Sequence, residues 1–99
     1  MPDDNPLAEL QEEVDTLLGT IDVTDDALME NYQRVVAVIV RLQQIHNDIS
    51  VLEIYGQASN ELKKFRTLVI DPTVDRLEKV AAFESRKLTA RQMELQLER

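Results

Sequence analysis

The sequence predicts an all-α fold, an elongated antiparallel three-helix bundle or helical hairpin with one long central helix. Three observations point to this class. Apolar residues recur at steps of three or four from Leu28 to Val69, which keeps them on one face of a helix. Glycine (2 residues) and aromatic residues (4%) are too scarce for the many turns of a sandwich or barrel. Helix-ending signals at Gly19 and at Asp71–Pro72 divide the 99 residues into three segments of a single domain.

The first helix is predicted over about residues 6–18. Asn5 is a suitable N-cap, and Pro6 suits the first helical position because the missing N–H has no partner there in any case. The apolar positions form two heptads of a seam, at Leu7, Leu10, Val14 and Leu17. Gly19 stands where a left-handed C-cap is expected, so we expect the helix to end there.

The second helix is predicted over about residues 25–70, with Thr24 as its N-cap and acidic residues in its first turn. Two weak points lie within it. Residues 47–50 are poor helix formers, and Gly56 is another soft position, so a break near 47–50 or near 56–58 is the alternative. Because the apolar stripe keeps its phase through both, we favour one continuous helix of about 1.5 Å per residue.

Asp71–Pro72 is predicted to end the second helix and to start a third over about residues 72–96. A proline disfavours helical geometry in the residue before it, and Asp71 with Pro72 forms a good N-cap and first helical position. The third helix should then fold back along the second. We expect the first helix to pack near residues 35–42, and residues 1–5 and the last few to fray.

Residues 35–40 form the most apolar run, Val-Val-Ala-Val-Ile-Val, and are rich in β-branched side chains. A lone strand with nothing to pair with is implausible. A helix that is apolar all round is normally buried on more than one face. The run is therefore expected at the thickest part of the bundle or inside an interface with a partner.

Charge is distributed unevenly along the chain, whose net charge is −8. Residues 1–33 contain ten acidic residues and no Lys or Arg, whereas residues 34–99 contain nine acidic and eleven basic ones. This balance argues against binding to nucleic acid or to anionic lipid. Two interpretations of the acidic third stay open, a solvated surface and a surface that docks onto a basic partner.

The compartment is only weakly marked. The chain has no cysteine, which excludes disulfides and thiol chemistry and is compatible with a reducing environment. The acidic start has no apolar core typical of a signal peptide, and no run approaches the roughly 20 apolar residues of a membrane span. We expect an intracellular, cytoplasmic protein, with a nuclear or cytoskeleton-associated location as the alternatives.

No catalytic, cofactor or metal site is predicted. The single histidine, His46, lies on the apolar stripe and is expected at the edge of a core or interface, with a pH-sensitive contact as the alternative. One histidine without cysteine cannot build a zinc site. The basic clusters at residues 63–66 and 86–91 are expected to pair with nearby acidic side chains rather than with nucleic acid, and no small-molecule substrate is expected.

The function we expect is that of a non-catalytic helical adaptor or structural subunit in a multi-subunit coiled-coil or bundle assembly. In general style the chain resembles small helical subunits of eukaryotic scaffold and tethering complexes. A hetero-oligomer is favoured, and a homodimeric helical regulator or secretion-type chaperone is the alternative. The candidate partner-binding residues are Val35, Val36, Val38, Ile39, Leu42, Ile45, Ile49, Leu88, Met93 and Leu97.

Overall fold

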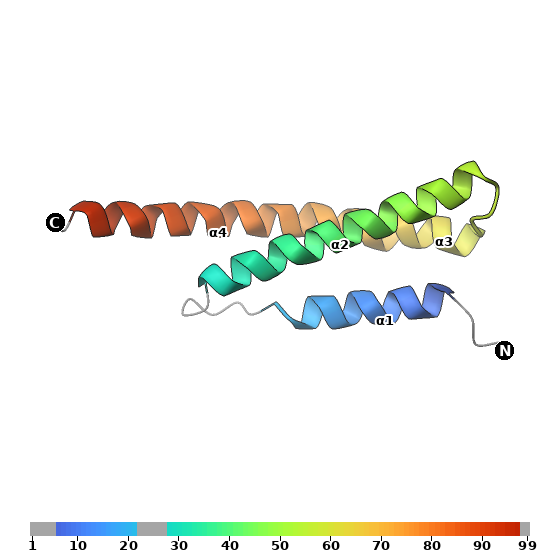
Figure 1. Ribbon diagram of the computed structural model, residues 1–99, viewed down its shortest axis with the longest axis horizontal. Coiled ribbons are helices and arrows are strands. Elements are labelled where there is room, and N and C mark those ends of the chain that lie inside the picture. Colours follow the sequence, from blue (N-terminus) through green and yellow to red (C-terminus); the bar gives the residue numbers. More distant parts are fainter. Residues whose placement is uncertain (1–5, 22–27, 98–99) are drawn as a thin grey trace.

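The computed structural model describes residues 6–21 and 28–97, and in that part of the chain it shows three helices and no strand (Figure 1). The elements are α1 (Pro6–Gly19), α2 (Leu28–Ile54), α3 (Asn60–Phe65), the π-helical segment η2 (Arg66–Ile70) and α4 (Asp71–Leu97). Because α3, η2 and α4 follow one another without a gap, they form one continuous helix. The predicted elongated all-α class is confirmed.

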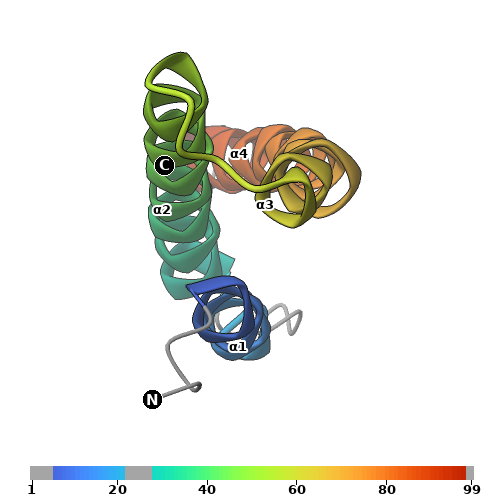
Figure 2. The same ribbon diagram turned by 90° about the vertical axis from the view of Figure 1, so that its right-hand side faces the viewer.

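The molecule is a rod with extents of 62 × 25 × 16 Å. Its radius of gyration is 17.3 Å, compared with about 13 Å for a compact domain of this length. Helix α2 runs antiparallel to the continuous helix α3–η2–α4, and α1 runs antiparallel to α2 (Figure 1). Seen along the rod, α3 and α4 lie on one side of α2 and α1 lies on another (Figure 2).

The seam between α2 and α4 has the spacing of a coiled coil. The buried residues of α2 are separated by steps of four and three, and are Asn31, Val35, Val38, Leu42, Ile45 and Ile49. The facing positions on the other helix, from η2 through α4, repeat in the same way, at Ile70, Val74, Leu77, Ala81, Glu84 and Leu88. Heptad spacing on both helices allows side chains to interdigitate along the whole seam, so the hairpin supplies most of the core.

The prediction of one helix over residues 25–70 is wrong, because α2 ends at Ile54. Gly56 has φ +70° and forms a Schellman cap. Its N–H donates to the Glu53 carbonyl at 3.0 Å, and the Gln57 N–H donates to the Leu52 carbonyl at 2.7 Å. These bonds satisfy carbonyls at the helix end, and the chain reverses here, within the alternative break at 56–58. Residues 25–27 lie outside the described residues, as do Thr24 and the acidic turn beside it.

The third helix begins at Asn60, twelve residues before the predicted start at Pro72. Ser59 is its N-cap, with φ −70°, ψ 162° and a side-chain oxygen that accepts from the Leu62 N–H at 3.1 Å. The apolar stripe kept its phase across this turn only because both arms of the hairpin direct their stripes to the same seam. Periodicity alone therefore could not reveal the break.

Asp71–Pro72 does not end a helix, which corrects the prediction of a turn at this point. Asp71 is helical, with φ −64° and ψ −45°, and its N–H donates to the Arg66 carbonyl five residues back. In an α-helix the Pro72 ring would clash with the carbonyl of residue 68, at a cost of about 3 kcal/mol. The wider π turn directly before the proline relieves this clash and lets the helix continue.

The π segment also moves the apolar stripe by one residue. Phe65 is buried, and the next buried position is Ile70, five residues later, while Val69 is 37% exposed. The expected step of four would have placed Val69 in the core. The inserted residue is what brings the heptads of α4 into line with those of α2.

Two further corrections concern α1 and residues 35–40. Helix α1 reaches the predicted region, residues 35–42, at Arg41, which pairs with Glu13, but its contact with α2 also extends farther, down to Leu52. Gly19 does not take the left-handed conformation predicted for it, since Gly56 is the glycine with positive φ in the described part. The 35–40 run is not buried on several sides, because Val36, Ala37 and Val40 are exposed.

Gly56→Ala should lower the free energy of unfolding by about 1 kcal/mol, because the left-handed conformation is unfavourable for a residue with a Cβ. Chemical denaturation measures the change. Gly19→Ala is the matched control: nothing lies within 4 Å of an added Cβ at either glycine, and Gly19 has no positive φ. The control should be neutral or slightly stabilising. Equal losses in both variants would contradict the proposed capping role of Gly56.

Candidate interaction surface

Ten exposed residues on the face of α2 opposite the core carry no charge. At about 100° per residue they fall within roughly 120° of the helix circumference. We define the outer α2 stripe as Met29, Gln33, Val36, Ala37, Val40, Gln43, Gln44, Asn47, Val51 and Ile54. With 30% charged residues in the chain, about three charges would be expected among ten positions. The five Asp, Glu, Lys and Arg residues of α2 all lie off this face, so the stripe is uninterrupted.

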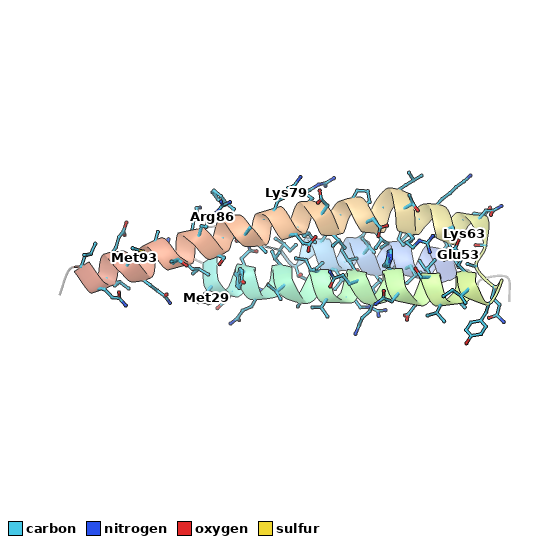
Figure 3. The ribbon with its side chains drawn as sticks, turned by 90° about the horizontal axis from the view of Figure 1, so that it is seen from above. Met29, Glu53, Lys63, Lys79, Arg86 and Met93 are labelled. Atoms are coloured by element: carbon cyan, nitrogen blue, oxygen red, sulfur yellow. The ribbon has the colours of Figure 1, made fainter. Side chains whose placement is uncertain are left out.

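Part of the stripe is strongly apolar and open to solvent. Val40 and Val51 are each 50% exposed and Ile54 is 80% exposed. Met29 projects away from α4 at the start of α2 (Figure 3). The two neighbouring helices cover other faces of α2, so this face is left uncovered within the described structure (Figure 2). Exposed apolar side chains that gather on one uncovered face in this way are typical of a protein interaction site.

The ten residues predicted to bind a partner divide into two groups. Val35, Val38, Leu42, Ile45 and Ile49 are at most 2% exposed and pack inside the hairpin. Of the others, Val36 belongs to the outer α2 stripe, Ile39 and Leu88 are half-buried, and Met93 and Leu97 are exposed. The predicted partner-binding set thus mixes residues of the hairpin core with residues that are partly or fully exposed. It missed Met29, Val40, Val51 and Ile54, which a search for uncharged positions at helical spacing would have found.

A second exposed apolar region lies at the end of α4. Asn31 pairs with Glu84 and His46 pairs with Asp71, so facing positions on the two helices have numbers that add to about 115–117. In this register position 28 faces residues 87–89, and the last eight residues of α4 extend past the start of α2 (Figure 1). We call residues 90–97 the α4 overhang. Met93, Leu95 and Leu97 on it are 58%, 66% and 83% exposed.

Acidic side chains border the outer α2 stripe on the side that faces α4. Between α2 and α4, a groove of about 390 Å³ is lined by Asp71, Asp75 and Glu78, together with Gln43 and Asn47 of the stripe. Between α1 and α2, a second groove, of about 310 Å³, is lined by the residues Glu9, Glu13, Arg41 and Asp48 and by an apolar floor. Six carboxylates and one guanidinium line the two grooves, but the α1–α2 groove contains no residue of the stripe, so only Asp71, Asp75 and Glu78 lie beside it.

One of these carboxylates connects α1 to α2. Arg41 donates from Nε to Glu13 Oε2 and from Nη2 to Glu13 Oε1, the latter at 2.9 Å. This two-point hydrogen bond from Arg41 lowers the pKa of Glu13, and the same bond raises the pKa of Arg41. The pair is the main polar contact that positions α1 on the hairpin.

A buried polar pair closes the far end of the hairpin seam. Asn31 Nδ2 donates to Glu84 Oε2, and the two residues are 1% and 8% exposed. Glu84 Oε1 is buried with no hydrogen-bond partner. A polar pair at one layer of an apolar seam is a known device for fixing register, because shifting the helices would leave both groups unpaired.

His46 and the basic clusters make contacts within the chain. His46 lies at the rim of the α2–α4 groove, with Nδ1 2.7 Å from Asp71 Oδ1. Arg66 donates to Ser50 Oγ at 3.1 Å and to Glu53 Oε1 at 2.7 Å, and this bond lowers the pKa of Glu53. Lys87 lies 5.0 Å from the centre of the Phe83 ring. The basic residues Lys79 and Arg86 point away from α2 (Figure 3).

Neither a metal centre nor a membrane span is found in residues 6–21 and 28–97. No group of three or more His, Cys, Asp or Glu side chains there could hold a metal ion. None of the described helices is long and apolar enough to cross a membrane. Comparison of the chain with protein-family models, with curated proteins and with solved structures gave no match. A function is therefore inferred from the outer α2 stripe and the α4 overhang.

Replacing Asn31 by Leu should lower the free energy of unfolding by about 2 kcal/mol, because the buried Glu84 carboxylate loses the amide that it accepts from. The double variant Asn31→Leu/Glu84→Leu should regain that loss, since it fills the layer with apolar side chains. Urea denaturation of the two single variants and the double variant gives the coupling free energy. Additive losses would show that the pair does not act as a unit.

The Glu13–Arg41 pair should stabilise the protein in a pH-dependent way. The pKa of Glu13 is below its ordinary value of 4.5 in the folded state, so its contribution is present above pH 4.5 and lost as pH falls through the lower folded-state pKa. Glu13→Gln should cost about 0.5 kcal/mol at pH 7, a small value because both side chains are more than a third exposed. The difference between wild type and variant should shrink as the pH falls below 4.5 and vanish once the pH is below the lowered folded-state pKa of Glu13. A difference that is constant with pH would contradict this assignment.

Proposed function

We propose that this chain is a non-catalytic helical adaptor or structural subunit that contributes its helices to a multi-subunit coiled-coil or bundle assembly. The observation that carries the proposal is the outer α2 stripe, which is long, uncharged and exposed along the whole of α2. A surface of this shape fits another helix better than a small molecule, which normally binds in a concave and largely enclosed pocket.

The α4 overhang supports the same function. It extends the helix beyond the hairpin and exposes Met93, Leu95 and Leu97 to solvent. A helical segment of about eight residues gains little stability by itself, and a partner that packs against it would bury its apolar side chains. The chain thus offers two surfaces to an assembly, one along its side and one at its end.

A hetero-oligomer is the form of assembly that we favour, because acidic groups line the α2–α4 groove along one edge of the stripe. We place the assembly inside the cell, in the cytoplasm, a proposal supported by the absence of cysteine from all 99 residues. A homodimeric regulator or chaperone is the competing form, and it would double the 11.4 kDa mass of one chain in solution.

Quantitative affinity purification from the native source tests the function with wild type, Val40→Glu and Leu68→Glu. Val40 is half exposed on the stripe, and Leu68 is 70% exposed elsewhere, so both variants should retain the helical circular dichroism of the wild type. We expect one set of proteins to be retained by wild type and by Leu68→Glu and lost from Val40→Glu. Identical sets from all three, or turnover of a small molecule by the purified chain, would contradict the adaptor function.

A further inference from the structure

We propose that the outer face of α4 is the docking site for one amphipathic helix of a partner protein, which carries Asp or Glu along one half and apolar side chains along the other. We define the outer α4 face as Arg76, Lys79, Phe83, Arg86, Lys87, Ala90, Met93 and Leu97. This inference rests on the proposed adaptor function and adds the chemistry of a partner for a surface other than the outer α2 stripe.

The outer α4 face is one continuous surface on the side of α4 opposite α2. At about 100° per residue its members fall within roughly 120° of the helix circumference. All of them are exposed. Lys79 and Arg86, which belong to this face, point away from α2 (Figure 3). No other described helix covers this side of α4 (Figure 2).

Positive charge dominates the first half of the face. Between residues 76 and 90 its charged members are all basic, namely Arg76, Lys79, Arg86 and Lys87. The acidic residues of that stretch lie elsewhere, since Glu78 lines the α2–α4 groove and Glu84 is buried in the seam. Farther along, Glu94 falls within the same arc of the helix. Carboxylates of a partner are therefore favoured opposite residues 76–87.

Two of the four cations are not engaged by side chains of the described residues. Neither Arg76 nor Arg86 forms an ion pair within residues 6–21 and 28–97. Lys79 pairs with Asp75 at 3.2 Å, but their side chains are 78% and 68% exposed, so this ion pair is weak. A carboxylate can accept two parallel hydrogen bonds from one guanidinium, which makes Arg76 and Arg86 the expected anchors of an acidic helix.

Apolar side chains form the second half of the face and continue along the α4 overhang. Ala90, Met93 and Leu97 follow one another at steps of three and four, and Met93 and Leu97 are 58% and 83% exposed. Phe83, 54% exposed, adds an aromatic ring among the cations. One partner helix of about 22 residues, or about 32 Å, spans both halves. Such a helix would bury these side chains and pair with the cations at the same time.

Helix α1 of a second copy is acidic but matches the face poorly. It has 14 residues and is therefore about 21 Å long, shorter than the face. Its apolar side chains pack against the core of its own hairpin, at Leu7, Leu10, Val14 and Leu17. They are not available to cover Met93 and Leu97, so a separate partner helix is the better occupant.

An anionic bilayer is also a poorer match. Basic and apolar side chains occur together on helices that lie on membranes. However, the whole chain has a net charge of −8, which opposes its approach to an extended negative surface. A single helix contacts the outer α4 face alone and avoids the acidic groups on the other sides of the rod.

Two synthetic helical peptides of about 22 residues test the inference against the full chain. They share one sequence, with leucines opposite the apolar half of the face, and differ only in having Glu or Lys opposite residues 76–87. Fluorescence anisotropy measures their dissociation constants. We expect the Glu peptide to bind at least about tenfold more tightly, and to weaken about tenfold between low and moderate salt. Attraction by the overall charge of −8 would instead favour the Lys peptide.

A reversal of charge locates the acidic half of the partner. Arg76→Glu/Arg86→Glu should reverse the preference, so that the Lys peptide binds more tightly. Arg34→Glu/Lys64→Glu is the matched control, because it changes the net charge by the same amount at exposed positions outside the face. The control should keep the original preference. Since all four side chains are exposed, both double variants should retain the helical circular dichroism of the wild type.

Two serine variants on the α4 overhang locate the apolar half. Met93→Ser should weaken binding of the Glu peptide about fivefold, because it removes apolar surface that the peptide buries. Leu95→Ser is the matched control: Leu95 is 66% exposed, and two residues farther along the helix its side chain lies about 200° round the axis. The control should leave the affinity unchanged.

Equal binding of the two peptides, a preference of the wild type for the Lys peptide, no binding, or equal effects of the two serine variants would overturn the inference. Sedimentation equilibrium of the chain alone should give a monomer, and a dimer that Arg76→Glu/Arg86→Glu dissociates would assign the face to a second copy. The chain should not cosediment with vesicles of phosphatidylserine and phosphatidylcholine. Cosedimentation that is lost in the same double variant would assign the face to a membrane.

Failure of this inference is distinguishable from failure of the proposed function. A native partner lost from Val40→Glu, together with no preference between the two peptides, would leave the adaptor function intact and refute only the chemistry assigned to α4. Identical sets of proteins purified with wild type and with Val40→Glu would contradict the adaptor function whatever the two peptides do.

Discussion

The antiparallel register of α2 against α4 is the constraint on which the other features of this molecule depend. It is fixed at one end by the Gly56 cap and the Ser59 N-cap, and at the other by the Asn31–Glu84 pair. Because the buried residues of both helices have heptad spacing, a register shift of one residue would misplace every pair of facing core residues between these points. The same register decides which face of α2 stays exposed and how far α4 extends past its partner.

The π segment reconciles this register with a proline in mid-helix. A straight α-helix through Pro72 would lose a hydrogen bond and clash with a carbonyl, and a helix ending there would leave the second arm of the hairpin too short to reach Asn31. The added residue in η2 avoids the clash and shifts the buried position from Val69 to Ile70. One local distortion therefore accommodates the proline and aligns the two apolar stripes.

Periodicity predicted the all-α class, the elongated shape and the bounds of α1 well, because these depend on local spacing. The turn was not predicted, since the stripe through Leu52, Ala58 and Leu62 has the same steps in a continuous helix and in a hairpin. Choosing between Gly19 and Gly56 as the left-handed glycine depends on which helix end must reverse direction, a tertiary property. The outer α2 stripe was missed because its signal is the absence of charge, which the periodicity of apolar residues does not register.

The seam also implies an order of assembly. Residue pairs across it are separated by 16 positions at Ser50–Arg66, 25 at His46–Asp71 and 53 at Asn31–Glu84. Closing a short loop costs less entropy than closing a long one. The two helices of the hairpin are therefore expected to pair first next to the Gly56 turn and then progressively farther from it. The Asn31–Glu84 pair then forms among the last contacts. If the helices pair in the wrong register, the free-energy cost arises at this point, because the Glu84 carboxylate is buried without the Asn31 amide opposite it.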